Sequence, residues 1–185
     1  MYGLQLRIAA RVVRAGGLIA YPTEAVYGLG CDPCDESAVM RLLALKRRSV
    51  NKGLILIAAD FAQLEPFLHP LSSSDRARLA ATWPGPQTWL ISAKPGVPRW
   101  LTGRHDTLAV RVTAHPAAAA LCRSCGHPLV STSANISARP PACSTLAVRR
   151  QFGQRLDYVL SGPTGGAAKP TAIQDLRTGY MVRSG

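Results

Sequence analysis

The sequence has few acidic side chains and few aromatic ones. Its 185 residues include 10 Asp plus Glu against 22 Lys plus Arg, which gives a net charge of +12, and aromatic residues make up only 6%. An apolar share of 47% with a charged share of 17% excludes an intrinsically disordered chain. No apolar run approaches the roughly 20 residues of a membrane-spanning helix. We therefore expect a soluble, cytoplasmic protein with a single domain over residues 1–185.

Most of the familiar catalytic motifs are also missing. There is no G-x-x-x-x-G-K-[ST] phosphate loop, no His-Glu-x-x-His, no G-x-S-x-G and no pair of carboxylates placed for acid/base work. The four histidines are dispersed along the chain and are expected at the surface: His69, His105, His115 and His127. What remains is a chain rich in cations and hydroxyls, which fits phosphoryl or nucleotidyl transfer by positioning and charge stabilisation.

The cysteines form two C-x-x-C pairs, Cys31 with Cys34 and Cys122 with Cys125, and Cys143 stands alone. Two such pairs outline a zinc site, but the usual separation is about 15–20 residues and here the pairs lie far apart in the chain. Residues 1–16 place arginines among apolar residues, as an amphipathic helix does and a secretory signal does not. Without an export signal, disulfides between these cysteines are not expected. Reduced, structural cysteines without metal are therefore expected.

Apolar stretches of strand length alternate with helical patterns. Strands are predicted at residues 18–21, 54–58, 89–93, 108–112 and 129–131. Helices are predicted at 36–47, 73–82, 115–123 and 144–152, and a terminal hairpin at 171–176 and 180–183 around Thr178-Gly179. This alternation predicts an α/β fold with helices packed on a sheet. Residues 162–170, rich in Gly and Pro, are predicted to form a loop that could act as a flap.

Two segments near the N-terminus concentrate polar groups where strands or helices end. Residues 21–30 run from a strand through Pro22 into a hydroxyl, a carboxylate and two glycines, which fits a ligand loop or a plain turn equally well. Lys46, Arg47, Arg48 and Lys52 put four cations into seven residues. Such a cluster suits a bound phosphate, although a basic helix C-terminus is also favoured by the helix dipole.

Two further segments lie in the second half of the chain. Residues 131–135, Ser-Thr-Ser-Ala-Asn, offer uncharged donors and acceptors for ribose or phosphate, or for a helix cap. Arg111 stands inside an otherwise apolar strand and needs an anionic partner, either a protein carboxylate or a substrate. Thr171 and Arg183 belong to the terminal hairpin.

Taken together, these segments resemble the TsaC/YrdC family of threonylcarbamoyl-AMP synthases. The matching motifs occur in the family's order and span nearly the whole chain: Pro22-Thr23-Glu24 to Gly30, Lys46-x-Arg48 with Lys52, Trp83-Pro84-Gly85-Pro86, residues 108–112, residues 131–135 and residues 171–183. The length is similar to that of the short bacterial form. The resemblance implies a YrdC-like twisted mixed sheet flanked by helices, with a basic concave cleft.

The resemblance also implies an activity and a set of site residues. Threonine, bicarbonate and ATP would give threonylcarbamoyl-adenylate and pyrophosphate, for threonylcarbamoyladenosine in tRNA, by a nucleotidyltransferase reaction with Mg²⁺ carried by ATP and no protein-bound metal. Downstream threonylcarbamoyl-transfer proteins would be partners. Carried over by position, the catalytic residues are Lys46, Arg48 and Asn135. The threonine-binding residues are Thr23, Arg111, Ser131 and Thr171. The ATP-binding residues are Arg48, Lys52, Thr107, Ser133 and Arg183.

The chain departs from the family pattern at two places. A histidine that binds threonine in some relatives is replaced by the apolar residues 54–57, and a serine that touches ATP in some relatives is replaced near Pro140-Pro141. An alternative function is a non-catalytic binder of structured RNA in ribosome or tRNA maturation, which net +12 supports. Weak binding of tRNA to a basic surface would be compatible with the enzyme as well.

Overall fold

The computed structural model describes residues 3–167 and 171–184. Its helices are α1 (Gly3–Arg14), α2 (Glu36–Lys46), α3 (Ser73–Ala80), α4 (Arg99–Thr102), α5 (Pro116–Cys125) and α6 (Thr145–Phe152), with short 3-10 turns η1 (Val50–Lys52), η2 (Glu65–Phe67) and η3 (Gly153–Arg155). Its strands are β1 (Ile19–Pro22), β2 (Tyr27–Gly30), β3 (Ile55–Ala58), β4 (Gln87–Ser92), β5 (Thr107–Val112), β6 (Leu129–Ser133), β7 (Tyr158–Val159), β8 (Ala172–Asp175) and β9 (Met181–Arg183).

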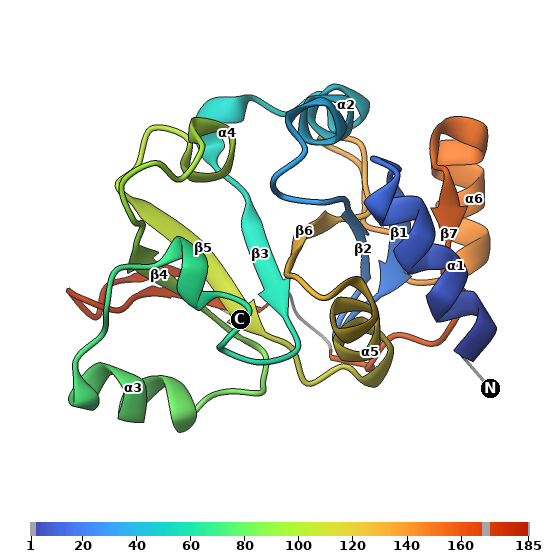
Figure 1. The fold of residues 1–185 in the computed structure, drawn as a ribbon. Helices are drawn as coiled ribbons and strands as arrows, with labels where there is room; N and C mark the ends of the chain where they lie inside the picture. Colours follow the sequence, from blue (N-terminus) through green and yellow to red (C-terminus); the bar gives the residue numbers. More distant parts are fainter. Residues whose placement is uncertain (1–2, 168–170, 185) are drawn as a thin grey trace.

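The strands form one mixed sheet in the order β7-β1-β2-β6-β3-β5-β4-β8-β9. The pairs β1–β7, β3–β5 and β4–β8 are parallel and the remaining neighbours are antiparallel. In Figure 1 the sheet runs from β7 and β1 on the right to β4 on the left, with helices packed along it. The predicted α/β class and the terminal hairpin, formed by β8 and β9, are confirmed.

The two faces of the sheet are covered to different extents. One face packs its apolar side chains, such as Leu56 and Val110, against α2, α3, α4 and α6. On the other face, α1 and α5 cover Ile19, Ile57 and Leu129. Both helices pack on each other and on the half of the sheet that contains β1, β3 and β7. None of the described helices is long and apolar enough to cross a membrane.

Helix ends follow local sequence signals. Asp35 caps α2 by accepting a hydrogen bond from the Ala38 backbone N–H, and α2 ends at Arg47, which has a positive φ of 53°. Pro116 opens α5, where its missing N–H costs nothing, and Gly126 ends the helix in the left-handed conformation.

The sequence prediction missed β2, α4 and β7. Residues 27–30, Tyr-Gly-Leu-Gly, were expected in a loop because glycine usually marks turns, but they form a buried strand. The glycines make room for Tyr21, which pairs with Gly28 across β1 and β2. A Cβ on Gly30 would lie 2.4 Å from the Val130 carbonyl oxygen and 2.8 Å from the Tyr21 ring. Close packing, and not a turn, explains these glycines.

The segment predicted as a flap is tied to the loop after β1 where the structure describes it. The backbone N–H of Gly165 donates to the Thr23 carbonyl at 2.9 Å, and that of Ala167 donates to the Glu24 carbonyl at 2.9 Å. The Tyr27 hydroxyl also donates to the Gly162 carbonyl at 2.5 Å. Residues 168–170 of the predicted loop lie outside the described residues.

We predict that Gly30→Ala destabilises the fold. The new methyl group would collide with a backbone oxygen that cannot move without disturbing β6, so the free energy of unfolding should fall by roughly 1–3 kcal/mol, as for other overpacked cores. Urea denaturation measures this. Gly3→Ala is the matched control, because no atom lies within 4 Å of a Cβ there. Equal stability of the two variants would contradict this account of β2.

Candidate functional site

Most predicted site residues lie on the face of the sheet that α1 and α5 leave partly uncovered. Cross-strand partners share a face, and so do residues two apart along a strand. Ser131 pairs with Ile55, and Ile57 pairs with Arg111, so Ser131 and Arg111 face the same side. The same face continues from β5 across β4 to the terminal hairpin, where Ile173 of β8 pairs with Arg183 of β9.

A pocket of about 350 Å³ opens on this face. Arg48, Lys52 and Thr107, three of the predicted ATP-binding residues, line it together with His105. The rest of the lining is mostly apolar: Leu54, Ile55, Leu90, Leu101, Ala109, Ile173 and Val182, with Gly53 and Thr102. An apolar wall beside two cations is suited to a nucleoside that carries phosphates.

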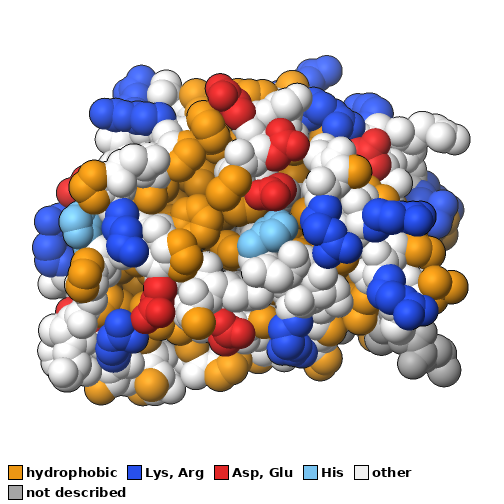
Figure 2. Space-filling model, viewed as in Figure 1, with side chains coloured by type: hydrophobic (Ala, Val, Ile, Leu, Met, Phe, Trp, Pro, Cys, Tyr) orange, Lys and Arg blue, Asp and Glu red, His pale blue; other side chains and the backbone are white. Residues whose placement is uncertain are grey.

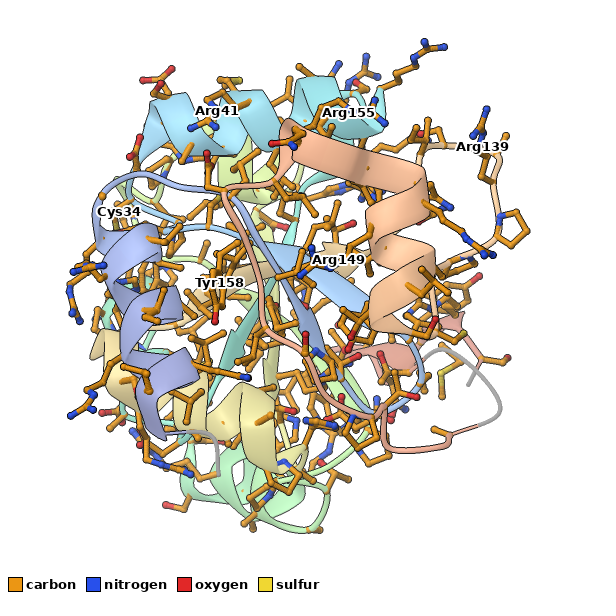
Figure 3. All side chains as sticks on the ribbon, turned by 90° about the vertical axis from the view of Figure 1, so that its right-hand side faces the viewer. Cys34, Arg41, Arg139, Arg149, Arg155 and Tyr158 are labelled. Carbon is orange, nitrogen blue, oxygen red and sulfur yellow. The ribbon has the colours of Figure 1, made fainter. Side chains whose placement is uncertain are left out.

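Lys and Arg side chains do not gather in one patch on the face shown in Figure 2. They are spread around its periphery, and hydrophobic side chains line the hollow near its centre. Figure 3 shows further arginines, Arg41, Arg139, Arg149 and Arg155, on the side formed by α1, α2 and α6. Arg41 is paired with Asp157 at 2.9 Å. The net charge is therefore distributed over the surface, and only some of it belongs to the site.

Two glycines set the position of the cations in the pocket. Gly53 and Gly103 both have a positive φ, and a Cβ on Gly103 would lie 2.5 Å from the Asn51 carbonyl oxygen and from the Gly53 backbone nitrogen. This close approach brings η1 against α4 and the loop after it. Lys52 therefore lies beside the start of β5, where Thr107 is located.

Lys46 is buried and all of its donors are used within the protein. Its ammonium group donates to the Ser133 carbonyl, to the Asn135 carbonyl at 2.8 Å and to Asn135 Oδ1 at 3.2 Å. The Ser133 hydroxyl donates to the same Oδ1 at 2.6 Å. Since an ammonium group has three N–H donors, Lys46 shapes the segment after β6 and has none left for a ligand in this arrangement.

Burial, and to a lesser extent the neighbouring Arg48 cation, lower the pKa of Lys46 to about 8. The ammonium form still predominates at neutral pH, in agreement with its three carbonyl acceptors. The four cations that lie within seven residues of sequence are thus separated in space, with Lys46 buried and Arg48 and Lys52 in the pocket.

Arg111 is paired with a protein carboxylate. Its Nη2 lies 3.2 Å from Glu24 Oε2, and its Nη1 donates to Thr171 Oγ1 at 2.8 Å. Arg183 reaches the same threonine, with its Nε and Nη2 donating to the Thr171 carbonyl at 3.1 and 2.6 Å. Thr88 completes the cluster, its hydroxyl 3.3 Å from that of Thr171. The predicted residues Arg111, Thr171 and Arg183 are therefore brought together directly.

Two buried guanidinium nitrogens lack partners within this site. Arg48 Nε and Arg111 Nε have no hydrogen-bond partner among the residues that the structure describes, and neither has Glu24 Oε2, whose contact with Arg111 is an ion pair without a hydrogen bond. Arg48 uses Nη2 for the Gly53 carbonyl, at 3.0 Å. Buried polar groups are normally hydrogen-bonded, so an unpartnered donor calls for an explanation, and a bound anion provides one, most directly for Arg48, which lines the pocket.

Thr23 and Ser131 are less directly placed. Thr23 Oγ1 donates to the Val26 carbonyl in its own loop at 2.6 Å, and no contact joins this hydroxyl to Arg111 or Thr171 in the described part of the chain. Ser131 is buried beside Tyr21, whose pKa is raised by burial. Both threonine-site candidates border the cluster without entering its hydrogen-bond network.

Three cysteines and one histidine are buried, whereas Cys34 and Cys143 are exposed. Within residues 3–167 and 171–184, no group of three or more His, Cys, Asp or Glu side chains could hold a metal ion. Burial raises the pKa of Cys31 and Cys122, so these thiols stay protonated. The expected surface position of His115 is wrong: it is 8% exposed because it caps α5, with Nδ1 3.4 Å from the Ala118 backbone nitrogen.

Sequence reasoning missed the contacts that Glu24, Thr88 and Thr113 make with the cluster. A signal for Glu24 was present, because it is an acidic residue of the loop after β1 and Arg111 is the isolated charge of β5. Two lone opposite charges in apolar surroundings favour pairing. Thr88 and Thr113 gave no comparable signal, since hydroxyls are common in strands and at their ends.

Known proteins with this architecture match almost the whole chain. The model of the Sua5/YciO/YrdC family, described as "Telomere recombination", matches residues 11–185. The chain therefore belongs to this family. It is 62% identical over 179 residues to the threonylcarbamoyl-AMP synthase of Nitrosococcus oceani, covering 97% of both chains. The enzyme of the same name from Methylococcus capsulatus is 56% identical over 181 residues, 98% of this chain and 97% of its own.

The crystal structure of P. abyssi Sua5 complexed with L-threonine has a TM-score of 0.88 at 36% identity and covers 94% of this chain. This chain spans 51% of that longer protein. E. coli YciO has a TM-score of 0.84 at 27% identity, with 97% of this chain and 88% of YciO covered. The YrdC-like fold expected from sequence is confirmed.

We predict that the stability difference between wild type and Lys46→Met changes with pH. The pKa of Lys46 is about 8 in the folded state and 10.5 for the free group, so between these values the unfolded chain binds more protons. Wild-type stability relative to Lys46→Met should therefore rise, by up to about 1.4 kcal/mol per pH unit between pH 8 and 10.

Urea denaturation of both proteins from pH 7 to 10 measures this difference, and the other titrating groups cancel. A difference that falls as pH rises would mean that the carbonyl acceptors raise the pKa of Lys46 more than burial lowers it.

Proposed function

We propose that this chain is a threonylcarbamoyl-AMP synthase, which condenses L-threonine, bicarbonate and ATP to threonylcarbamoyl-adenylate and pyrophosphate for the modification of tRNA. Full-length relatives that carry this name, at 54–62% identity, support the proposal. A relative's structure with L-threonine supports the amino-acid substrate. Within the molecule, the supporting observation is the pair of buried, unpartnered Nε–H groups of Arg48 and Arg111 on one face of the sheet.

These two arginines suit the two kinds of anion in the reaction. Arg48 lines the pocket with Lys52 and Thr107, where an apolar wall accommodates a nucleoside and the cations accommodate its phosphates. Arg111 lies among hydroxyls on the neighbouring strands. We assign it to the threonine carboxylate, which is smaller than the triphosphate of ATP. Among the described residues, Arg111 donates one hydrogen bond, from Nη1 to Thr171, and its Nη2 forms the ion pair with Glu24, so its Nε–H remains without a partner.

The remaining site residues take roles according to their place. Thr23, Ser131 and Thr171 surround the proposed threonine site with Arg111. Ser133 and Arg183 are the further residues that we assign to ATP. Asn135, held by Lys46, fixes the segment that presents Ser133, so Lys46 and Asn135 support the reaction by position.

The chemistry then needs no protein nucleophile. Threonine nitrogen and bicarbonate form a carbamate with loss of water. A carbamate oxygen attacks the α-phosphorus of ATP, and the bond from that phosphorus to the bridging oxygen breaks to release pyrophosphate. Arg48 and Lys52 offset the charge that develops on the leaving pyrophosphate, and the apolar wall limits access of water that would hydrolyse the product.

We expect Mg²⁺ to accompany the triphosphate. The charged residues that line the pocket are cations, so the phosphate oxygens and water would hold the metal, as this ion prefers. A cytoplasmic location, indirect or weak contact with tRNA, and hand-over of the adenylate to threonylcarbamoyl-transfer proteins follow from the same proposal.

Binding of structured RNA without catalysis remains the second candidate, favoured only by the net charge of +12. On the face shown in Figure 2 the cations form no continuous basic track, which phosphate-driven recognition requires. RNA binding that persists above roughly 200 mM salt would support this function, because purely ionic binding weakens steeply there.

The decisive assay is pyrophosphate release from ATP and Mg²⁺, with threonine or bicarbonate omitted in turn. We predict release only when both are present. Arg48→Ala should raise the KM for ATP by roughly 10-fold or more, as expected for loss of a charge-assisted contact. Arg41→Ala is the control, since Arg41 is an exposed arginine of α2 paired with Asp157, and should change the KM less than about twofold. Release that is independent of threonine would refute the proposed function.

A further inference from the structure

Glu24 is a buried carboxylate without an assigned role, beside the proposed threonine site. It is 8% exposed, and its partner Arg111 is 5% exposed. Glu24 Oε1 accepts from the Thr113 hydroxyl at 2.6 Å and from the Ala114 backbone N–H at 3.2 Å. Its Oε2 lies 3.2 Å from Arg111 Nη2. The two oxygens therefore have different partners: Oε1 accepts from the residues that follow β5, and Oε2 pairs with Arg111.

Arg111 is held from two sides by these contacts. Glu24 attracts Nη2 as an ion pair without a hydrogen bond, and Nη1 donates to Thr171, so these two contacts together restrict the orientation of the planar guanidinium. That orientation decides where the unpartnered Nε–H points. Thr171 is itself held by Arg183 and Thr88, so the orientation of Arg111 depends on both the loop after β1 and the terminal hairpin.

Charge gives Glu24 a second effect. Arg111 and Arg183 both donate to Thr171, and the Arg183 pKa is lowered by burial and by the Arg111 charge. Glu24 is the only carboxylate within 4.0 Å of either guanidinium among the described residues. Removing its charge would leave two neighbouring cations without a counter-ion, which favours movement of Arg111 toward solvent.

We propose that Glu24 is a positioning residue for the amino-acid substrate: it orients Arg111 to receive the threonine carboxylate and does not itself contact threonine. A carboxylate next to the substrate carboxylate would repel it. A carboxylate that pairs with Arg111 on the side away from the substrate instead leaves the remaining N–H donors of Arg111 directed toward the substrate. The inference rests on the proposed function, because it assigns Arg111 to threonine.

The test is the steady-state kinetics of Glu24→Gln in pyrophosphate release. Glutamine is isosteric, and its amide oxygen can keep the Thr113 and Ala114 contacts while its NH₂ group faces Arg111 and cannot accept from it. We expect the KM for threonine to rise about 10-fold or more and the KM for ATP to change less than twofold. Thr113→Val is the matched control, because it removes one contact of Glu24 but leaves the Arg111 pair, and should change the threonine KM less than threefold.

The Arg111→Lys background separates positioning from general structure. If Glu24 acts through the guanidinium, Glu24→Gln should cause no further rise in the threonine KM when Arg111 is lysine. Glu24→Asp, which is too short to reach both Thr113 and Arg111, should repeat the threonine effect if Glu24→Gln does not fold.

Three results would overturn the role of Glu24 in a protein whose wild type is active: equal changes in both KM values, no change in either, or an undiminished effect in the Arg111→Lys background. Absence of threonine-dependent release from wild type would instead refute the proposed function, and the inference with it.

Discussion

The ion pair between Glu24 and Arg111 is the contact on which the organisation of the site depends. A buried arginine in the middle of a strand is costly unless it is paired and hydrogen-bonded, and here the partners come from distant parts of the chain. Glu24 belongs to the loop after β1 and Thr171 to the residues before β8. The loop and the terminal hairpin are thus joined at one guanidinium, so the threonine site is assembled only when the whole sheet has formed.

The unequal covering of the sheet explains where ligands can bind. On one side, α2, α3, α4 and α6 bury the apolar face almost completely, whereas on the other α1 and α5 cover only the half near β1. The uncovered half carries the pocket with Arg48 and Lys52. The terminal hairpin contributes Val182 to the pocket and Arg183 to the Arg111 cluster, so one element borders both proposed ligand sites.

The sequence predicted most of the fold but little of the site's geometry. Apolar runs and helical periodicity are local signals, and they located the strands at 54–58 and 108–112 and the helix at 115–123, which begins at Pro116 in the structure. They failed for β2, because Gly28 and Gly30 serve the packing of Tyr21, a contact that local sequence does not reveal. The same limit applies to the site. Motif positions indicated Lys46, Arg111 and Thr171, but only the fold showed that Lys46 is fully engaged with residues 133–135 and that Arg111 already has a carboxylate partner.

The most direct test of the central claim is a crystal structure of this protein with L-threonine. The account predicts the threonine carboxylate within hydrogen-bond distance of Arg111, with the contact between Glu24 and Arg111 kept and Glu24 more than 4 Å from the amino acid, beyond the usual limit for an ion pair. Threonine bound away from Arg111, or Glu24 in direct contact with it, would contradict the account.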